Sequence, residues 1–210
     1  MKNIKAIIFD LGGVLLNISY QNTIASFKKL GIKNTDNIYS KKTQSHIFNL
    51  IETGEITAKK FLEDLQVFTN NATIQEVKDA WNAMLLNLPK KRLQVLLSLK
   101  SNHALFLLSN TNTIHINAIS NKLGARKWEG FCNLFDKIYL SHEIGIRKPN
   151  SEAFQLILNQ QKLNPKEVLF IDDSYQHIVS AKKLGIICYH IKDGEDITTL
   201  FPDKVQSALH

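Results

Sequence analysis

The sequence predicts an α/β protein, with a Rossmann-like, doubly wound parallel sheet as its core and a small all-helical cap domain. Two observations carry this prediction. Short apolar runs with the length of buried strands alternate with helix-like segments along most of the 210 residues. Between residues 19 and 88 the alternation stops, and the pattern there is helical throughout. A helical insertion after the first strand is expected to form a small bundle above one edge of the sheet.

Five apolar runs are expected to form the strands of this sheet. Parallel strands are covered by helices on both faces, so they read as continuous apolar runs rather than alternating ones. The predicted strands are residues 5–9, 104–108, 137–140, 168–171 and 186–190, of which 137–140 is the weakest.

Helices are predicted between these strands, at residues 92–100, 150–159 and 175–184. Pro89 precedes the first of them and Pro149 the second, and proline suits the start of a helix. Gly185 follows the third helix, where glycine is a common C-cap.

The insertion is expected to contain four helices. They are predicted at residues 21–30, 43–51, 57–69 and 74–86, with Thr57 as an N-cap. We therefore divide the chain into an α/β core, residues 1–18 and 89–210, and a helical cap, residues 19–88. Ligands of open α/β sheets bind at the carboxyl ends of the strands, and the cap is expected above that edge.

Composition and charge limit the classes of binding partner and the cellular location that we expect. The net charge is +7, but the lysines are scattered in pairs rather than gathered with aromatic residues, which is typical of a solvated surface. No nucleic-acid motif, signal peptide or membrane-spanning segment is recognised. Cys132 and Cys188 lie in apolar surroundings and are expected to be reduced. We predict a cytoplasmic protein, a monomer or weak homodimer, with neither nucleic acid nor membrane as a partner.

Polar residues cluster where three of the predicted strands end. Asp10 follows the first strand, Ser109 the second, and the pair Asp172–Asp173 the fourth. The loop GIRKP adds Lys148. If these loops converge, three carboxylates repel one another, and a hard cation with oxygen ligands, Mg²⁺, resolves the repulsion.

The remaining groups suit a phosphoryl substrate. A hydroxyl, nearby backbone N–H groups and the Lys148 ammonium would bind phosphate oxygens. Asp10 is then placed as a nucleophile that forms an aspartyl-phosphate.

Four motifs give this pattern a family resemblance. IIFDLGGVLL, LFLLSNTN, GIRKPNSEAF and VLFIDDSYQHIVSAKKLGI occur in this order along the chain. The sequence resembles the haloacid dehalogenase (HAD) superfamily of hydrolases, with a helical cap inserted after the first strand. The segment IETGEITAKKFLEDL resembles cap segments of one subgroup. The FDLG-type first motif is similar to that of the sugar-phosphate phosphatase-like subgroup.

The resemblance implies roles for the residues of these motifs. Asp10 is the implied nucleophile, and Lys148 is the implied catalytic lysine that neutralises the phosphate and the nucleophile. Ser109 matches the hydroxyl that holds a phosphate oxygen, and Asn110 follows it. With Gly12, Gly13 and Lys148, these two residues make up the expected substrate-binding set.

The resemblance also implies a magnesium site. Asp173 would bind Mg²⁺ directly, and Asp172 directly or through water. Asp10 and the backbone carbonyl of Gly12 would complete the set of ligands from the chain.

Two positions depart from the family pattern. Gly12 stands where most phosphatases of this superfamily carry a second aspartate, which protonates the leaving oxygen and later activates water. Such general acid–base help is worth about 10²–10⁴-fold, so slow turnover is expected unless another group compensates. His177 stands where asparagine is more common. His115 is expected to be a surface or packing residue, and Trp81 is expected to pack in the core or the cap.

The predicted function is a Mg²⁺-dependent phosphatase that hydrolyses a small phosphorylated metabolite, such as a sugar phosphate, through an aspartyl-phosphate intermediate. Two alternatives stay open. A 2-haloacid dehalogenase would use Asp10 to attack carbon, although the pair Asp172–Asp173 argues against it because that chemistry needs no metal. A catalytically weak, phospho-ligand-binding regulatory protein would have lost turnover with the acid at Gly12.

Overall fold

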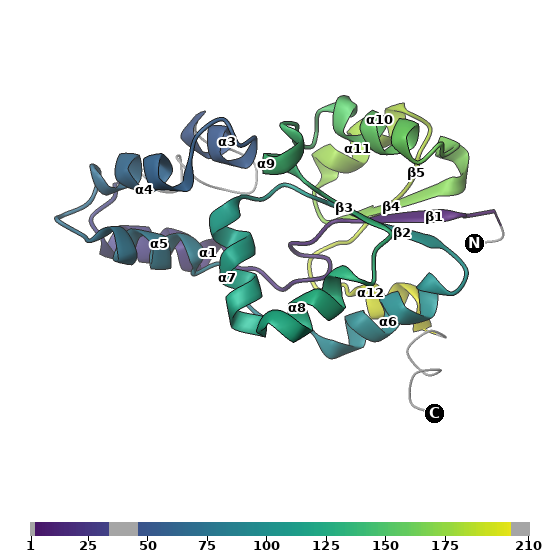
Figure 1. The fold of residues 1–210 in the computed structure, drawn as a ribbon, viewed down its shortest axis with the longest axis horizontal. Coiled ribbons are helices and arrows are strands. Elements are labelled where there is room, and N and C mark those ends of the chain that lie inside the picture. The colour runs from purple at the N-terminus through teal and green to yellow at the C-terminus, as the bar shows by residue number, and fades with distance from the viewer. Residues whose placement is uncertain (1–2, 34–45, 203–210) are drawn as a thin grey trace.

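The sheet has five parallel strands, in the order β3-β2-β1-β4-β5 (Figure 1). A computed structural model describes residues 3–33 and 46–202. The strands are β1 (Ala6–Phe9), β2 (Ala104–Ser109), β3 (Lys137–Leu140), β4 (Val168–Asp172) and β5 (Ile187–His190). All five predicted strands are confirmed, each within one residue of its expected ends.

The order of the strands places the first strand at the centre of the sheet. β1 pairs with β2 on one side and with β4 on the other, and Phe9 lies opposite Leu107 and Ile171. The chain therefore leaves the sheet after β1, β2 and β4 at neighbouring points of one edge. Asp10 and Asp172 lie level with each other at that edge.

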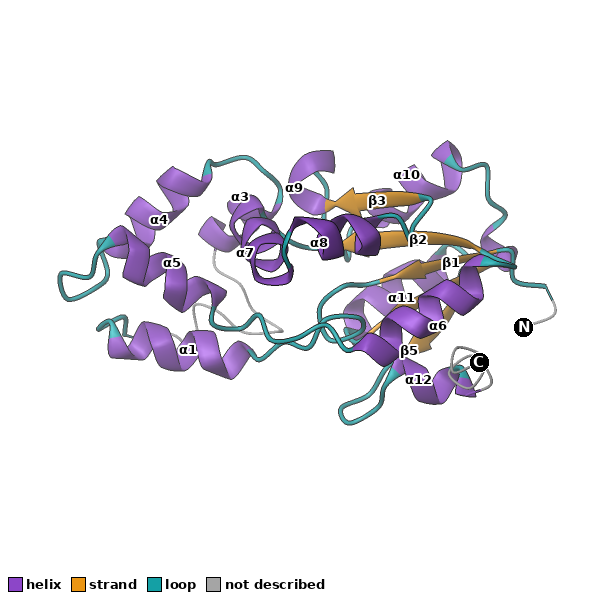
Figure 2. Cartoon of the chain, turned by 60° about the horizontal axis from the view of Figure 1, so that its bottom comes forward, coloured by secondary structure: helices purple, strands orange, loops and turns teal. Residues whose placement is uncertain are grey.

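Helices cover both faces of the sheet (Figure 2). Those of the core are α6 (Lys90–Lys100), α7 (Thr113–Leu123), α8 (Ala125–Cys132), α9 (Ser141–Ile144), α10 (Ser151–Gln160), α11 (Tyr175–Lys183) and α12 (Ile197–Leu200), with a 3₁₀ turn at Pro165–Glu167. Alternate residues of each strand enter two separate apolar clusters, as the pleat requires. Ile7 and Phe9 pack with residues of α6, α7, α8 and α12, whereas Ile8 packs with residues of α10 and α11.

The three predicted core helices are confirmed as α6, α10 and α11. Helices α7 and α8 are not predicted from the sequence. Asn112 caps the first of them, because its side chain accepts a hydrogen bond from the backbone N–H of His115 at 3.0 Å. Gly124, with a φ of 80°, separates the two helices.

The insertion contains α1 (Tyr20–Lys29), α3 (His46–Glu52), α4 (Ala58–Gln66) and α5 (Ile74–Asn82), which lie beyond the carboxyl edge of the sheet (Figure 1). The predicted helix 43–51 begins outside the described residues and continues as α3. Trp81 is fully buried at the centre of the insertion, within 5.2 Å of the rings of Phe48 and Phe61. Trp81 is therefore a packing residue, as expected.

Two of the predicted cap helices end early. The helix predicted at 74–86 stops at Asn82, because the following residues pair with the segment that enters the insertion. The N–H of Ser19 donates to the carbonyl of Met84, and Ile18 and Leu85 form an antiparallel bridge. The helix predicted at 57–69 stops at Gln66, whose carbonyl accepts a hydrogen bond from the Thr69 hydroxyl.

The cap and the core also share packing. Ile114 of α7 belongs to the apolar cluster of the insertion, and the ring of His115 stacks on Trp81 at 4.5 Å. The limits of the two domains, placed at residues 18 and 88, stay a prediction. Within residues 3–33 and 46–202, no helix is long and apolar enough to span a membrane.

Candidate active site

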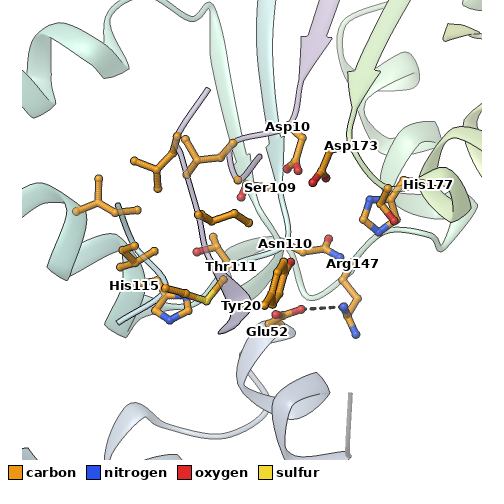
Figure 3. A pocket seen from close by; sticks show the side chains of 18 of the residues that line it. Asp10, Tyr20, Glu52, Ser109, Asn110, Thr111, His115, Arg147, Asp173 and His177 are labelled. Atoms are coloured by element: carbon orange, nitrogen blue, oxygen red, sulfur yellow. Dashed lines mark ion pairs between the residues drawn. The ribbon is translucent and has the colours of Figure 1, made fainter. Parts of the chain in front are cut away.

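Three carboxylates meet at the carboxyl edge of the sheet. Asp10, Asp172 and Asp173 each offer an oxygen, and these oxygens all lie within 4.8 Å of one another. The parallel register brings them together, since Asp10 follows the central strand β1, Asp172 ends its neighbour β4, and Asp173 comes directly after that strand. Asp10 and Asp173 face a pocket between cap and core (Figure 3), whereas Asp172 is completely buried.

Lys148 holds two of these carboxylates. Its side chain is completely buried, and Nζ lies 2.9 Å from Oδ1 of Asp10 and 2.6 Å from Oδ2 of Asp172. Asn110 fixes the backbone of this lysine with two hydrogen bonds: its Oδ1 accepts from the Lys148 N–H at 2.9 Å, and its Nδ2 donates to the Lys148 carbonyl at 2.8 Å. The structure thus gives Asn110 a positioning role that the sequence does not reveal.

Asp172 is held by further groups. Its Oδ1 accepts a hydrogen bond from the Ser174 N–H at 2.7 Å and lies 3.0 Å from Nδ1 of His177. Burial favours the neutral acid, but Lys148 and His177 outweigh it and lower the pKa of Asp172 to about 2. His177 therefore orients this carboxylate, which gives a structural role to a residue whose role the sequence leaves open.

The negative charge of Asp10 is less well compensated than that of Asp172. Burial raises the pKa of its carboxyl to about 7, against the opposing effect of Lys148 and with added repulsion from Asp172 and Asp173. The Lys148 ammonium thus contacts two of three clustered carboxylates. A second cation would relieve this imbalance, and a donor set made of carboxylate oxygens suits Mg²⁺. The residues present therefore fit the metal that the sequence predicts.

The two glycines after Asp10 have different functions. Gly13 has a φ of 77°, and a Cβ there would lie 2.3 Å from Oδ2 of Asp173, so only glycine lets this carboxylate approach. Its N–H donates to the carbonyl of Leu16 at 2.8 Å. Gly12 lines the pocket, and a Cβ at this position would meet only the flexible end of Ile18, at 3.1 Å.

This difference yields a first prediction. We expect Gly13→Ala to weaken Mg²⁺ binding at least tenfold, because the added methyl group displaces the Asp173 carboxylate. Calorimetric titration with Mg²⁺ would measure the change. Gly185→Ala is the matched control: its φ is 83°, but the nearest atom to its Cβ would be Pro165 Cβ at 3.8 Å. Both variants carry backbone strain of about 1 kcal/mol, so an equal loss of Mg²⁺ affinity in both would contradict this interpretation.

Three of the five predicted substrate-binding residues line the pocket, and two do not. Ser109, almost completely buried at the end of β2, lines the pocket with Asn110 and Gly12. The side chain of Lys148 is fully buried and contacts the carboxylates. The N–H of Gly13 donates a hydrogen bond within its own turn. Contact of these residues with a substrate stays a prediction.

Several residues that line the pocket are not among the site residues predicted from the sequence, and three of them lie together at one end. Tyr20 and Glu52 come from the cap and Arg147 from the loop before Lys148, and they lie at the opposite end of the pocket from Asp10 (Figure 3). Nη2 of Arg147 lies 2.9 Å from Oε2 of Glu52. The position of Arg147 next to Lys148 in GIRKP is a signal that sequence reasoning could have used. No local pattern marks Tyr20 or Glu52.

His115 also lines the pocket but is committed to packing. Its ring stacks on Trp81, its Nε2 lies 3.3 Å from the Trp81 carbonyl, and its Nδ1 lies 3.3 Å from Nδ2 of Asn112. Burial lowers the pKa of His115 to about 4. It is therefore a neutral packing residue, in agreement with the prediction.

Comparison with known proteins agrees with this geometry. The sequence profile of haloacid dehalogenase-like hydrolases matches residues 4–185. D-ribitol-5-phosphate phosphatase from Bacteroides thetaiotaomicron is 30% identical over 194 residues, which cover 92% of this chain and 94% of that protein.

Solved structures have the same fold. A HAD family enzyme from B. thetaiotaomicron, in complex with magnesium and inorganic phosphate, has a TM-score of 0.81 and 34% identity, over 94% of this chain and 99% of that one. A HAD-like hydrolase from Porphyromonas gingivalis has a TM-score of 0.83 and 28% identity, over 96% and 97% of the two chains.

The sheet, the acidic cluster with its buried lysine, and the sequence matches lead to one assignment. The chain belongs to the haloacid dehalogenase-like hydrolase family, and within it to the phosphomonoesterases.

Proposed function

We propose that this hydrolase is a Mg²⁺-dependent phosphatase of small phosphorylated metabolites, a sugar or sugar-alcohol phosphate, and that Asp10 is its nucleophile. One observation carries the proposal. The Asp10 carboxylate faces the pocket while its Oδ1 lies 2.9 Å from the buried Lys148 ammonium, within the cluster formed with Asp172 and Asp173. A carboxylate held in this way is oriented for attack on phosphorus.

The reaction then has two steps. An oxygen of Asp10 attacks phosphorus, the bond from phosphorus to the ester oxygen breaks, and the released alkoxide takes up a proton. Water next attacks the phosphorus of the aspartyl-phosphate, which frees Asp10 and inorganic phosphate. Lys148 offsets the negative charge of Asp10 before attack and that of the phosphoryl group as it transfers. Ser109, at the pocket wall, would hold a phosphate oxygen.

Asp10 and Asp173 are the residues that would hold Mg²⁺ at the pocket, together with the Gly12 carbonyl. Asp172 would contribute directly or through water, and it is held in place by Lys148 and His177. The metal supplies charge neutralisation for the phosphoryl oxygens.

The proposed substrate class has support from outside the acidic cluster. A relative that matches this chain along nearly the whole length of both proteins is a D-ribitol-5-phosphate phosphatase. The pocket between cap and core is lined by polar groups and also by apolar side chains, those of Leu16, Ile18, Met84, Leu85 and Ile119. Such a pocket suits a short carbon chain that carries hydroxyl groups.

A phosphate-release assay tests the proposal. The panel contains D-ribitol 5-phosphate, D-glucose 6-phosphate, 2-phosphoglycolate and p-nitrophenyl phosphate, each with Mg²⁺ and with excess chelator. We expect Mg²⁺-dependent release that is fastest with the sugar-alcohol phosphate, and loss of release on chelation. Activity that survives chelation would contradict the metal assignment. Binding of phosphate esters without any release would instead favour a regulatory protein.

Gly12 allows a prediction about the missing acid. We expect Gly12→Asp to raise kcat about tenfold or more, because it supplies a proton donor at the pocket wall, and general acids contribute about 10²–10⁴-fold. The backbone at Gly12 needs no positive φ, and only the end of the Ile18 side chain must move. Steady-state kinetics would measure the change.

Gly12→Asn is the matched control for that experiment. It has the same shape and cannot donate an acidic proton, so kcat should not rise. If the aspartate variant is folded, binds Mg²⁺ and is no faster than the asparagine variant, proton transfer is already served by water, the substrate or another residue.

A further inference from the structure

The end of the pocket away from Asp10 is built from charged groups that the proposed chemistry does not use. Glu52, the last residue of α3, has a buried side chain that lines the pocket. Nη2 of Arg147 lies 2.9 Å from its Oε2, and Nη1 of the same arginine donates to Oδ1 of Asn49. Figure 3 shows this ion pair below Asn110, with Asp10 and Asp173 at the other end. A substrate whose phosphate binds at Asp10 would extend toward it.

The position of Glu52 is set by close packing of the cap on the core. Gly54, two residues further on, approaches the core so closely that a Cβ there would lie 2.3 Å from the carbonyl oxygen of His142. The backbone beside Glu52 is therefore held close to the core at Gly54, and the carboxylate of Glu52 is held by Arg147. A group fixed in this way discriminates between ligands better than a mobile one.

The hydrogen-bonding groups of Glu52 and Arg147 determine which ligand group can bind between them. Glu52 as a carboxylate only accepts hydrogen bonds, and the guanidinium of Arg147 only donates them. Among the described residues, the buried Nε–H of Arg147 has no hydrogen-bond partner, so the guanidinium keeps donor capacity that its printed contacts do not use. A hydroxyl group both donates and accepts, so it can serve Glu52 and Arg147 together. A carboxylate in the same place would be repelled by Glu52.

We propose that the Glu52–Arg147 pair is the specificity-determining element of this pocket: it binds the hydroxyl end of a polyol phosphate and excludes substrates that end in a carboxylate. The inference rests on the proposed phosphatase function and extends it from a broad substrate class to the group at the far end of the substrate. Tyr20 also lines the pocket next to the pair (Figure 3).

A matched pair of substrates tests the inference. D-Ribitol 5-phosphate and D-ribonate 5-phosphate have the same chain length and differ at carbon 1, which is an alcohol in the first and a carboxylate in the second. We expect the wild-type protein with Mg²⁺ to prefer the polyol at least tenfold in kcat/KM. Glu52→Gln removes the negative charge but keeps the shape. It should reduce this preference at least tenfold, because Arg147 then faces the substrate carboxylate without a competing anion.

Two variants control the experiment. Glu63→Gln removes an exposed carboxylate of the cap, which lies 3.8 Å from Lys59 on the same helix, and should leave the preference unchanged. Glu52→Asp keeps the charge, so it should retain the exclusion of the ribonate ester even where its overall kcat/KM falls. If Glu52→Gln does not fold, as judged by circular dichroism, the preference of the wild-type protein between the two esters still tests the exclusion.

The possible outcomes separate the two proposals. If the wild-type protein hydrolyses both esters equally, or if folded Glu52→Gln keeps the wild-type preference, the specificity role is wrong while the phosphatase function stands. If Glu63→Gln reduces the preference as much as Glu52→Gln does, Glu52 is not the discriminating group. If the wild-type protein releases no phosphate from either ester or from p-nitrophenyl phosphate, the proposed function fails, and the inference fails with it.

Discussion

Asp10→Asn is expected to lower kcat by about four orders of magnitude or more while the protein stays folded. The amide is a poor nucleophile and cannot form the aspartyl-phosphate, and the loss of a catalytic nucleophile has costs of this size in other hydrolases. The side chain keeps its shape, and Lys148 keeps Asp172 as a partner at 2.6 Å. Phosphate release measures the first expectation, and thermal unfolding followed by circular dichroism measures the second.

The control for this variant is Asp79→Asn, which removes an exposed carboxylate on α5 whose Oδ1 accepts a hydrogen bond from Gln75. Its kcat should equal that of the wild-type protein. Near-normal hydrolysis by folded Asp10→Asn would overturn the assignment of the nucleophile. The outcome would then favour a mechanism in which water attacks phosphorus directly.

Lys148→Met is expected to cost about 3–5 kcal/mol of the free energy of unfolding, because it leaves buried carboxylates without their cation. Nζ of Lys148 contacts both Asp10 and Asp172, and the side chain has no exposed surface. The same change should abolish phosphate release. Urea unfolding in Mg²⁺-free buffer would measure the loss of stability.

Mg²⁺ should return part of that stability. The site of Lys148→Met carries one positive charge less, so added Mg²⁺ should stabilise this variant more than the wild-type protein. Lys137→Met is the matched control, since Lys137 is exposed on β3 and donates to Oε1 of Gln160. It should change the free energy of unfolding by less than about 1 kcal/mol. Equal effects of the two substitutions would show that the buried lysine does not compensate the carboxylates.

The strands and the catalytic motifs could be predicted because their signals are local. A buried parallel strand is a continuous apolar run, and all five such runs are strands. Polar residues directly after such runs fall at the same edge of the sheet, whatever the packing elsewhere. That rule predicts that Asp10, Asp172 and Asp173 lie at one edge of the sheet, and the pairing of β1 with β4 brings the three carboxylates together there.

The errors at the cap also have a physical cause. The apolar periodicity of residues 74–86 continues past Asn82, but Ile18 pairs with Leu85 as two linkers run side by side. That pairing joins residues far apart in the sequence, and no local pattern reports it. Helical periodicity therefore predicts the right element and the wrong end.

The sequence by itself determined the fold class, the order of the motifs and the residues of the acidic cluster, since each depends on which residues follow which. Only the tertiary structure decided how those residues are used. It buried Lys148 between two carboxylates, gave Asn110 the task of holding it, and showed that Gly13 is needed for the approach of Asp173. It also brought Glu52 from the cap to Arg147 in the core. These contacts join residues distant in the chain, so packing alone creates them.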